Sequence, residues 1–79
     1  MDRELQQYYD ERFSLFATKG WQELLEDLEA MLEQYEDITK IPDEQTLWYR
    51  KGQVDILQYL LNLKKLTEQT YEELSNESP

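Results

Sequence analysis

The chain has 79 residues, and its 18 acidic and 8 basic side chains give a formal net charge of −10. It contains neither cysteine nor histidine, which excludes disulfides, zinc sites of the Cys/His type and the common acyl-transfer catalytic sets. A chain this short buries a small core, so good helix packing or self-association has to supply the stability.

The first predicted helix covers residues 3–18. Its apolar and aromatic residues recur at i, i+3 and i+4, the spacing of one helix face, and Asp2 is a suitable N-cap. Two interpretations fit its end. Gly20 terminates this helix in a left-handed conformation, or Thr18 is the N-cap of the next helix.

The second predicted helix covers residues 21–36 and is the most acidic segment of the chain. Its apolar residues repeat in a 3-4 rhythm that builds one apolar seam. Residues 20–39 include no basic side chain, so the acids form a negative face. This acidic face consists of Glu23, Glu26, Asp27, Glu29, Glu33, Glu36 and Asp37. It serves either ordinary solvation or the binding of a basic partner.

The third predicted helix starts at the N-cap Asp43 and runs to Leu74, with a possible break at residues 65–67 because residues 70–73 resemble a capping box. Arg50 and Lys51 are expected to form ion pairs with acids of the second helix. A glycine inside a helix costs stability, so Gly52 needs a structural reason. The reason we expect is the close approach of another helix, under Trp21 or Trp48 or at a dimer axis. The apolar residues form two adjoining stripes, Leu47/Val54/Leu57/Leu61 and Tyr49/Ile56/Leu60/Leu63.

At about 1.5 Å per residue, the third helix is as long as the first two together. One of its stripes can meet the second helix, and the first helix packs either on residues 63–74 or on another subunit. We predict an all-α fold, an antiparallel helical hairpin plus an N-terminal helix (three helices), with one domain at residues 1–74 and a disordered tail at 75–79. Since one layer of helices leaves apolar surface uncovered, we predict assembly into a homodimeric helical bundle. The residues expected at the packing or self-association interface are Trp21, Leu28, Tyr35, Trp48, Gly52, Ile56, Leu60 and Leu63.

The acids of the second helix also raise the question of metal chemistry. All-helical nucleotide pyrophosphohydrolases hold Mg²⁺ with Glu-x-x-Glu on one helix and Glu-x-x-Asp on the next. Here the second motif would have to come from residues 52–55, where Gly52 replaces the glutamate and only Asp55 remains. Because Mg²⁺ needs several converging oxygens, we expect no metal site. We likewise expect no cofactor, no catalytic residues and no enzymatic activity. A degenerate bundle of this hydrolase type is the third functional hypothesis.

Two segments of the chain resemble small uncharacterised proteins of tailed bacteriophages. The likeness covers residues 20–63, and its main part is Arg-Lys-Gly-Gln at residues 50–53, followed by an aliphatic run. The matching residues are Gly20-Trp21-x-x-Leu24-x-x-Asp27-Leu28 and Leu47-Trp48-Tyr49-Arg50-Lys51-Gly52-Gln53-Val54-x-Ile56-Leu57-x-x-Leu60-Leu61-x-Leu63. The resemblance implies a phage or prophage origin and an accessory role, and it supplies no catalytic residues.

The leading functional prediction is therefore a non-catalytic, acidic, oligomeric helical protein that acts through protein–protein interaction in an assembly or accessory virion-related role. The alternative is a DNA-mimic-like acidic inhibitor of a host nucleic-acid enzyme. The expected partners are a second copy of the chain and a basic protein, not nucleic acid or membrane. Residues 1–4 lack the apolar core of a signal peptide and no apolar run is long enough to span a membrane, so we expect the host cytoplasm or the virion.

Overall fold

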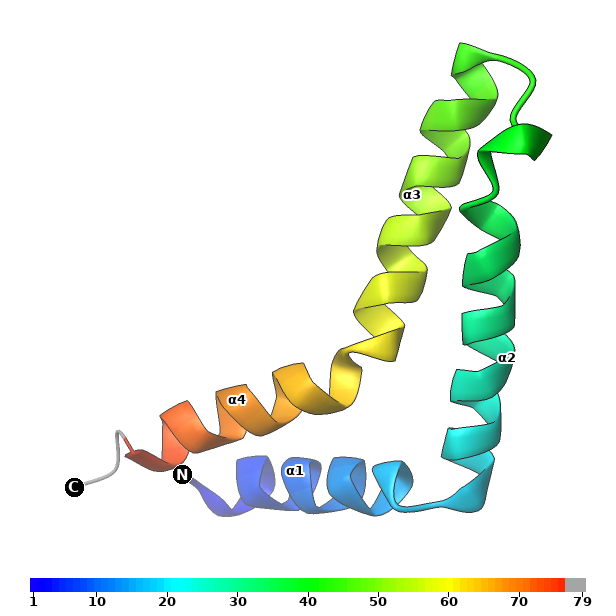
Figure 1. Cartoon of the computed structure of the whole chain (residues 1–79). Coiled ribbons are helices and arrows are strands. Elements are labelled where there is room, and N and C mark those ends of the chain that lie inside the picture. The colour runs from blue at the N-terminus through cyan, green and yellow to red at the C-terminus, as the bar shows by residue number, and fades with distance from the viewer. Residues whose placement is uncertain (77–79) are drawn as a thin grey trace.

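The computed structural model describes residues 1–76, which form four α-helices and one short 3₁₀ segment and contain no strand (Figure 1). The elements are α1 (Arg3–Phe16), α2 (Lys19–Tyr35), η1 (Ile38–Lys40), α3 (Glu44–Leu61) and α4 (Leu63–Asn76). The all-α prediction is confirmed. The prediction of three helices is wrong, because the third predicted helix is divided into α3 and α4 at Asn62.

Side-chain caps start three of the four helices; Asp2 and Asp43 were predicted, and Thr18 was one of two alternatives. Asp2, Thr18 and Asp43 each accept a hydrogen bond from the backbone N–H three residues later, at 2.7, 3.1 and 2.7 Å. These bonds satisfy donors that have no partner inside the helix. Thr18 therefore begins α2, and Gly20 lies within that helix without a left-handed backbone.

The break between α3 and α4 is a bend made by a single residue. Asn62 has φ −100° and ψ 4°, its backbone N–H donates to the carbonyl of Gln58, and its side-chain amide donates to the same carbonyl at 2.8 Å. The carbonyl at the end of α3 is thus satisfied locally. The bend lies before the expected break at residues 65–67, and Thr70 is inside α4, where its hydroxyl donates to the carbonyl of Leu66.

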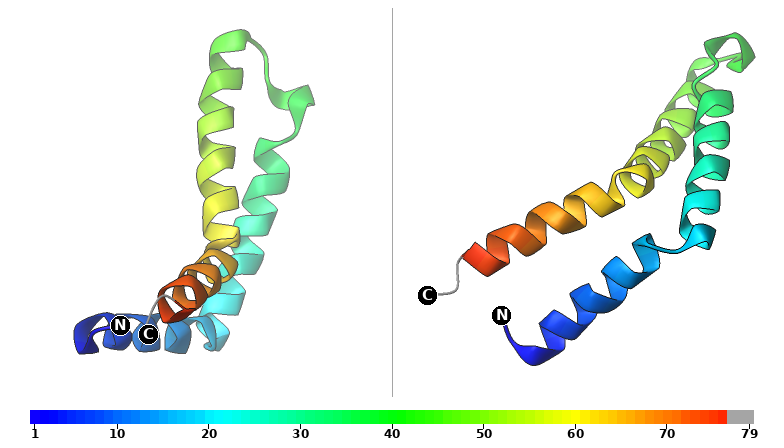
Figure 2. Two further views of the ribbon diagram at one scale, coloured as in Figure 1. Left: turned by 90° about the vertical axis from the view of Figure 1, so that its left-hand side faces the viewer. Right: turned by 60° about the horizontal axis from the view of Figure 1, so that its bottom comes forward.

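The four helices form two arms of an L, with α2 beside α3 in one arm and α1 beside α4 in the other (Figures 1 and 2). The first helix thus packs on its own chain. The molecule measures 54 × 27 × 16 Å. Its radius of gyration is 16.8 Å, against about 12 Å for a compact domain of this length. Because one helix with its side chains is about 10–12 Å across, the short dimension holds little more than a single layer of helices.

The buried core is small and joins the two arms. The rings of Phe16 and Trp21 pack across the α1–α2 turn with centroids 5.1 Å apart. The ring of Tyr71, on α4, lies 5.3 Å from both Tyr9 and Phe13 of α1. The buried residues are Tyr9, Phe16, Trp21, Leu57 and Thr67. In the described part of the chain, every large side chain is at least 2% exposed.

Helix α4 ends at Asn76, so two residues of the predicted tail are helical and the others lie outside the described residues. Within residues 1–76, no helix has both the length and the apolar character that crossing a membrane requires.

Candidate interaction surface

One side of the α2–α3 arm carries an open, uncharged groove. Tyr49 and Ile56 project from α3 into this groove and are 73% and 61% exposed. On α2, Met31 and Tyr35 form the opposite wall. The groove has a volume of about 470 Å³ and is lined by Met31, Tyr35, Tyr49, Gly52, Gln53, Ile56 and Leu57, a set that we call the apolar groove.

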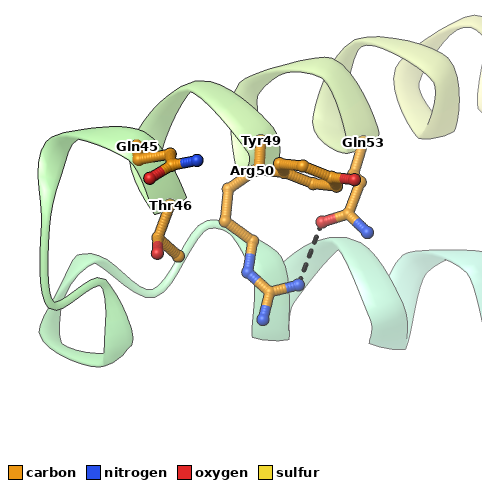
Figure 3. A pocket seen from close by; sticks show the side chains of 5 residues that line it. All are labelled: Gln45, Thr46, Tyr49, Arg50 and Gln53. Atoms are coloured by element: carbon orange, nitrogen blue, oxygen red, sulfur yellow. Dashed lines mark hydrogen bonds between the residues drawn. The ribbon is translucent and has the colours of Figure 1, made fainter.

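A polar recess adjoins the apolar groove in the first half of α3, and the two share Tyr49 and Gln53 (Figure 3). Arg50 reaches from α3 towards α2, and its guanidinium carbon lies 4.6 Å from the ring centroid of Tyr35. One guanidinium nitrogen, Nη1, donates to Gln53 at 3.0 Å. Arg50 is therefore held by a cation–π contact and an amide.

The expected ion pairs between α3 and the acids of α2 are not formed among the described residues. Lys51 pairs instead with Asp55, one turn along its own helix, at 3.4 Å. Arg50 and Tyr35 are both half-buried, so their stacking supplies the contact between the helices that the ion pairs were expected to make.

A second groove is lined by residues of α1, α3 and α4. Tyr59, one turn after Ile56 on α3, is 53% exposed and lines it. Leu66 of α4 and Tyr8 of α1 also line this groove, which has a volume of about 250 Å³. Its charged residue is Arg12, whose guanidinium donates to the Tyr8 hydroxyl at 3.0 Å and lies 5.2 Å from the Tyr8 ring centroid.

The acidic face is solvent-exposed along α2 and at its C-cap Glu36, whereas its last residue, Asp37, lies beyond the helix. Asp37 is half-buried and caps η1, and its carboxylate accepts hydrogen bonds from the hydroxyl and the backbone N–H of Thr39 at 2.6 and 3.0 Å. These bonds hold the pKa of Asp37 below its ordinary value. The exposed members are Glu23, Glu26, Asp27, Glu29, Glu33 and Glu36. Within residues 1–76, no three acidic side chains converge in a way that could hold a metal ion.

The structure divides the predicted interface residues between the core and the surface. Trp21 is buried against Phe16 and belongs to the core of the chain itself. Trp48 and Ile56 are 62% and 61% exposed. The half-buried members are Leu28, Tyr35, Leu60 and Leu63.

Gly52 is exposed, and a Cβ atom built on it would meet nothing within 4 Å. Among the described residues neither Trp21 nor Trp48 comes within 4 Å of that position, and the alternative of a dimer axis at Gly52 stays a prediction. Sequence reasoning did not select Met31, Tyr49 or Tyr59 for the surface. The available signal was the 3-4-3 spacing of residues 49, 52, 56 and 59, which places all four on one side of α3.

Comparison of this chain with protein-family models, with curated proteins and with solved structures finds no match. Its function therefore has to be inferred from the surfaces described above.

Proposed function

We propose that the protein is a non-catalytic interaction module that self-associates through the apolar groove and presents the acidic face outward. The observation that carries this proposal is the large, uncharged and exposed apolar surface on one side of a single layer of helices. Soluble monomers rarely expose contiguous apolar surface of this kind, and such patches mark sites of association. A stable domain usually has two packed layers around its core, and a second subunit supplies the missing layer.

The accessible surface of the chain supports the same conclusion. It amounts to 6417 Å², whereas a compact monomer of 9.7 kDa exposes roughly 5,100 Å². The excess of roughly 1,300 Å² is larger than the area of about 800 Å² that one partner of a standard protein–protein interface buries. Association through the apolar groove would thus lower the exposed area per chain towards that of a compact domain.

The acidic face supports a role in binding a basic protein. Residues 20–39 carry seven acids and no base, and six of the acids are exposed, five on α2 and Glu36 at its C-cap. A dense field of one sign attracts partners of the opposite sign and accelerates their association. The resemblance to phage proteins adds an expected setting, which is an accessory role in a phage or prophage.

Sedimentation velocity at tens of micromolar protein tests the self-association. The expected mass is about twice 9.7 kDa. Ile56→Glu places a charge in the apolar groove and should shift the protein to monomer. Leu47→Glu is the matched control, because Leu47 is on the same helix and 46% exposed but does not line the groove. A native protein that remains strictly monomeric would refute the proposed self-association.

A second candidate function is inhibition of a DNA-binding enzyme by charge mimicry. From Glu23 to Glu33 helix α2 rises by about 15 Å, so its five acids are on average about 4 Å apart along the axis, against the roughly 3.4 Å between phosphates of one DNA strand. Charge mimicry predicts that the protein displaces DNA from a basic nuclease or polymerase, and that added salt weakens this displacement. Binding that is indifferent to salt would contradict it.

A further inference from the structure

One side of α3 carries a stripe of four residues that no element within residues 1–76 covers. Tyr49, Gly52, Ile56 and Tyr59 are all exposed, and their spacing of three, four and three residues places them along one seam of the helix. The spacing is also symmetric about residue 54, since Gly52 and Ile56 flank it equally, as do Tyr49 and Tyr59. The spacing of the stripe is therefore the same in both directions along α3.

We propose that a second copy of this chain docks on the stripe with its α3 antiparallel, and with a twofold axis beside residue 54. In this register Ile56 packs against the partner's Gly52, and Tyr49 packs against the partner's Tyr59. Twofold interfaces require such reciprocity, because each pair of contacting residues occurs twice. The inference rests on the proposed self-association and specifies its geometry.

Gly52 acquires a role in this register. Nothing within the chain lies near the position of its missing Cβ, so internal packing does not account for a glycine in the middle of α3. In the dimer, the space above Gly52 receives the partner's Ile56. A large residue set against a small one is the complementarity that lets two helices approach closely.

Charge and area both fit a second copy. Each chain carries a net charge of −10, and the four residues of the stripe carry no charge, so docking on the stripe places no like charges of the stripe against each other. Charged residues border the stripe: Arg50 lines the recess beside Tyr49, Arg12 lines the groove beside Tyr59, and Asp55 is paired with Lys51 at 3.4 Å. Tyr49, Ile56 and Tyr59, with the flanking Trp48 and Met31, expose roughly 500–600 Å² per chain, so a dimer would bury roughly 1,000–1,200 Å², up to the lower limit of about 1,200 Å² for specific, stable interfaces.

Disulfide cross-linking tests the register, and the chain offers a background without native cysteine. Tyr49→Cys and Tyr59→Cys variants are mixed and oxidised. The mixed disulfide should form in high yield, because the two positions face each other across the interface. Either variant alone should cross-link poorly, since ten residues of helix separate like positions by about 15 Å, beyond the roughly 7 Å between Cα atoms that a disulfide tolerates. Lys51→Cys mixed with Gln58→Cys is the control, because both positions are exposed but lie on another side of α3.

The outcomes separate the register from the proposed function. A monomeric native protein overturns both. If Tyr49→Cys forms a disulfide with the same residue of the partner, the helices do not pair in the proposed antiparallel register. If the protein is a dimer but the mixed disulfide does not form, the dimer uses a different surface or swaps one arm between the two chains. Either result overturns the register alone. As a second readout, Gly52→Leu should weaken dimerisation at least tenfold while helicity is retained, and tighter dimerisation would contradict the packing of Ile56 on Gly52.

Discussion

Replacement of Gly52 by alanine should stabilise the isolated chain. Gly52 lies in the interior of α3 with no positive φ, and a methyl group there would meet no atom within 4 Å. The change therefore acts through backbone entropy alone, since no contact is gained or lost. Alanine is favoured over glycine in a helix interior by about 1 kcal/mol, which corresponds to a rise in Tm of about 4–8 °C for a domain of this size.

Thermal unfolding followed by circular dichroism measures this effect, first at a protein concentration low enough for the chain to be monomeric. At high concentration the gain in Tm should shrink, because the same methyl group occupies the space of the partner's Ile56 and weakens the dimer. Gly20→Ala is the control: Gly20 is also free of neighbours within 4 Å but lies in the first turn of α2, away from the stripe. A loss of stability at low concentration would refute the assignment of free space around Gly52, and an equal gain at both concentrations would refute its place in the interface.

Substitutions at three further positions test the fold. Leu57→Ala removes a side chain that is 5% exposed, and should cost about 2–5 kcal/mol of unfolding free energy by urea titration; a loss below about 1 kcal/mol would contradict its burial. Thr18→Ala leaves the backbone N–H of Trp21 without its cap and should cost about 1 kcal/mol, whereas Thr18→Ser should restore the loss. The backbone N–H of Thr46 lowers the pKa of Asp43 from 3.8, so this carboxylate stabilises the fold at neutral pH and the contribution is lost as the pH falls through the lowered folded-state value. Asp43→Asn keeps a capping acceptor that does not titrate, so between about pH 7 and about pH 3 its urea midpoint should fall less than that of the native protein; an equal fall would exclude Asp43 as a source of the acid sensitivity.

The helix starts were predictable from the sequence because capping is a local interaction. Asp2, Thr18 and Asp43 each precede a periodic segment, and each hydrogen bond joins residues only three positions apart. The bend at Asn62 was not predictable in this way, because its neighbours include neither glycine nor proline. The bend lets Tyr71 reach the rings of α1, which is a tertiary requirement that no local pattern encodes.

The candidate surface was only partly predictable for a related reason. Helix α3 carries apolar residues on two sides, and periodicity alone does not say which side faces α2. The structure buries Leu57 and half-buries Val54, and it leaves Tyr49 and Ile56 exposed. The groove was also incomplete in the prediction because Met31 of α2 faces it only once α2 and α3 are set side by side.

The two helices of one arm of the L are close together in the sequence, whereas the two helices of the other arm are far apart in the sequence. This difference should affect the folding kinetics. Helices α2 and α3 are joined by a short connection, whereas the arm of α1 and α4 unites the two ends of the chain, as in the 3.3 Å hydrogen bond from Gln6 to Tyr71, 65 residues apart. The chain loses more entropy in closing the longer loop between α1 and α4. The α2–α3 contacts should therefore form in the folding transition state, and the ring contacts of Tyr71 should form after it. The expected φ value at Tyr71 is near zero. Contacts made after the transition state slow unfolding without speeding folding. The arm that joins the termini should therefore set the lifetime of the native state rather than the rate at which it is reached.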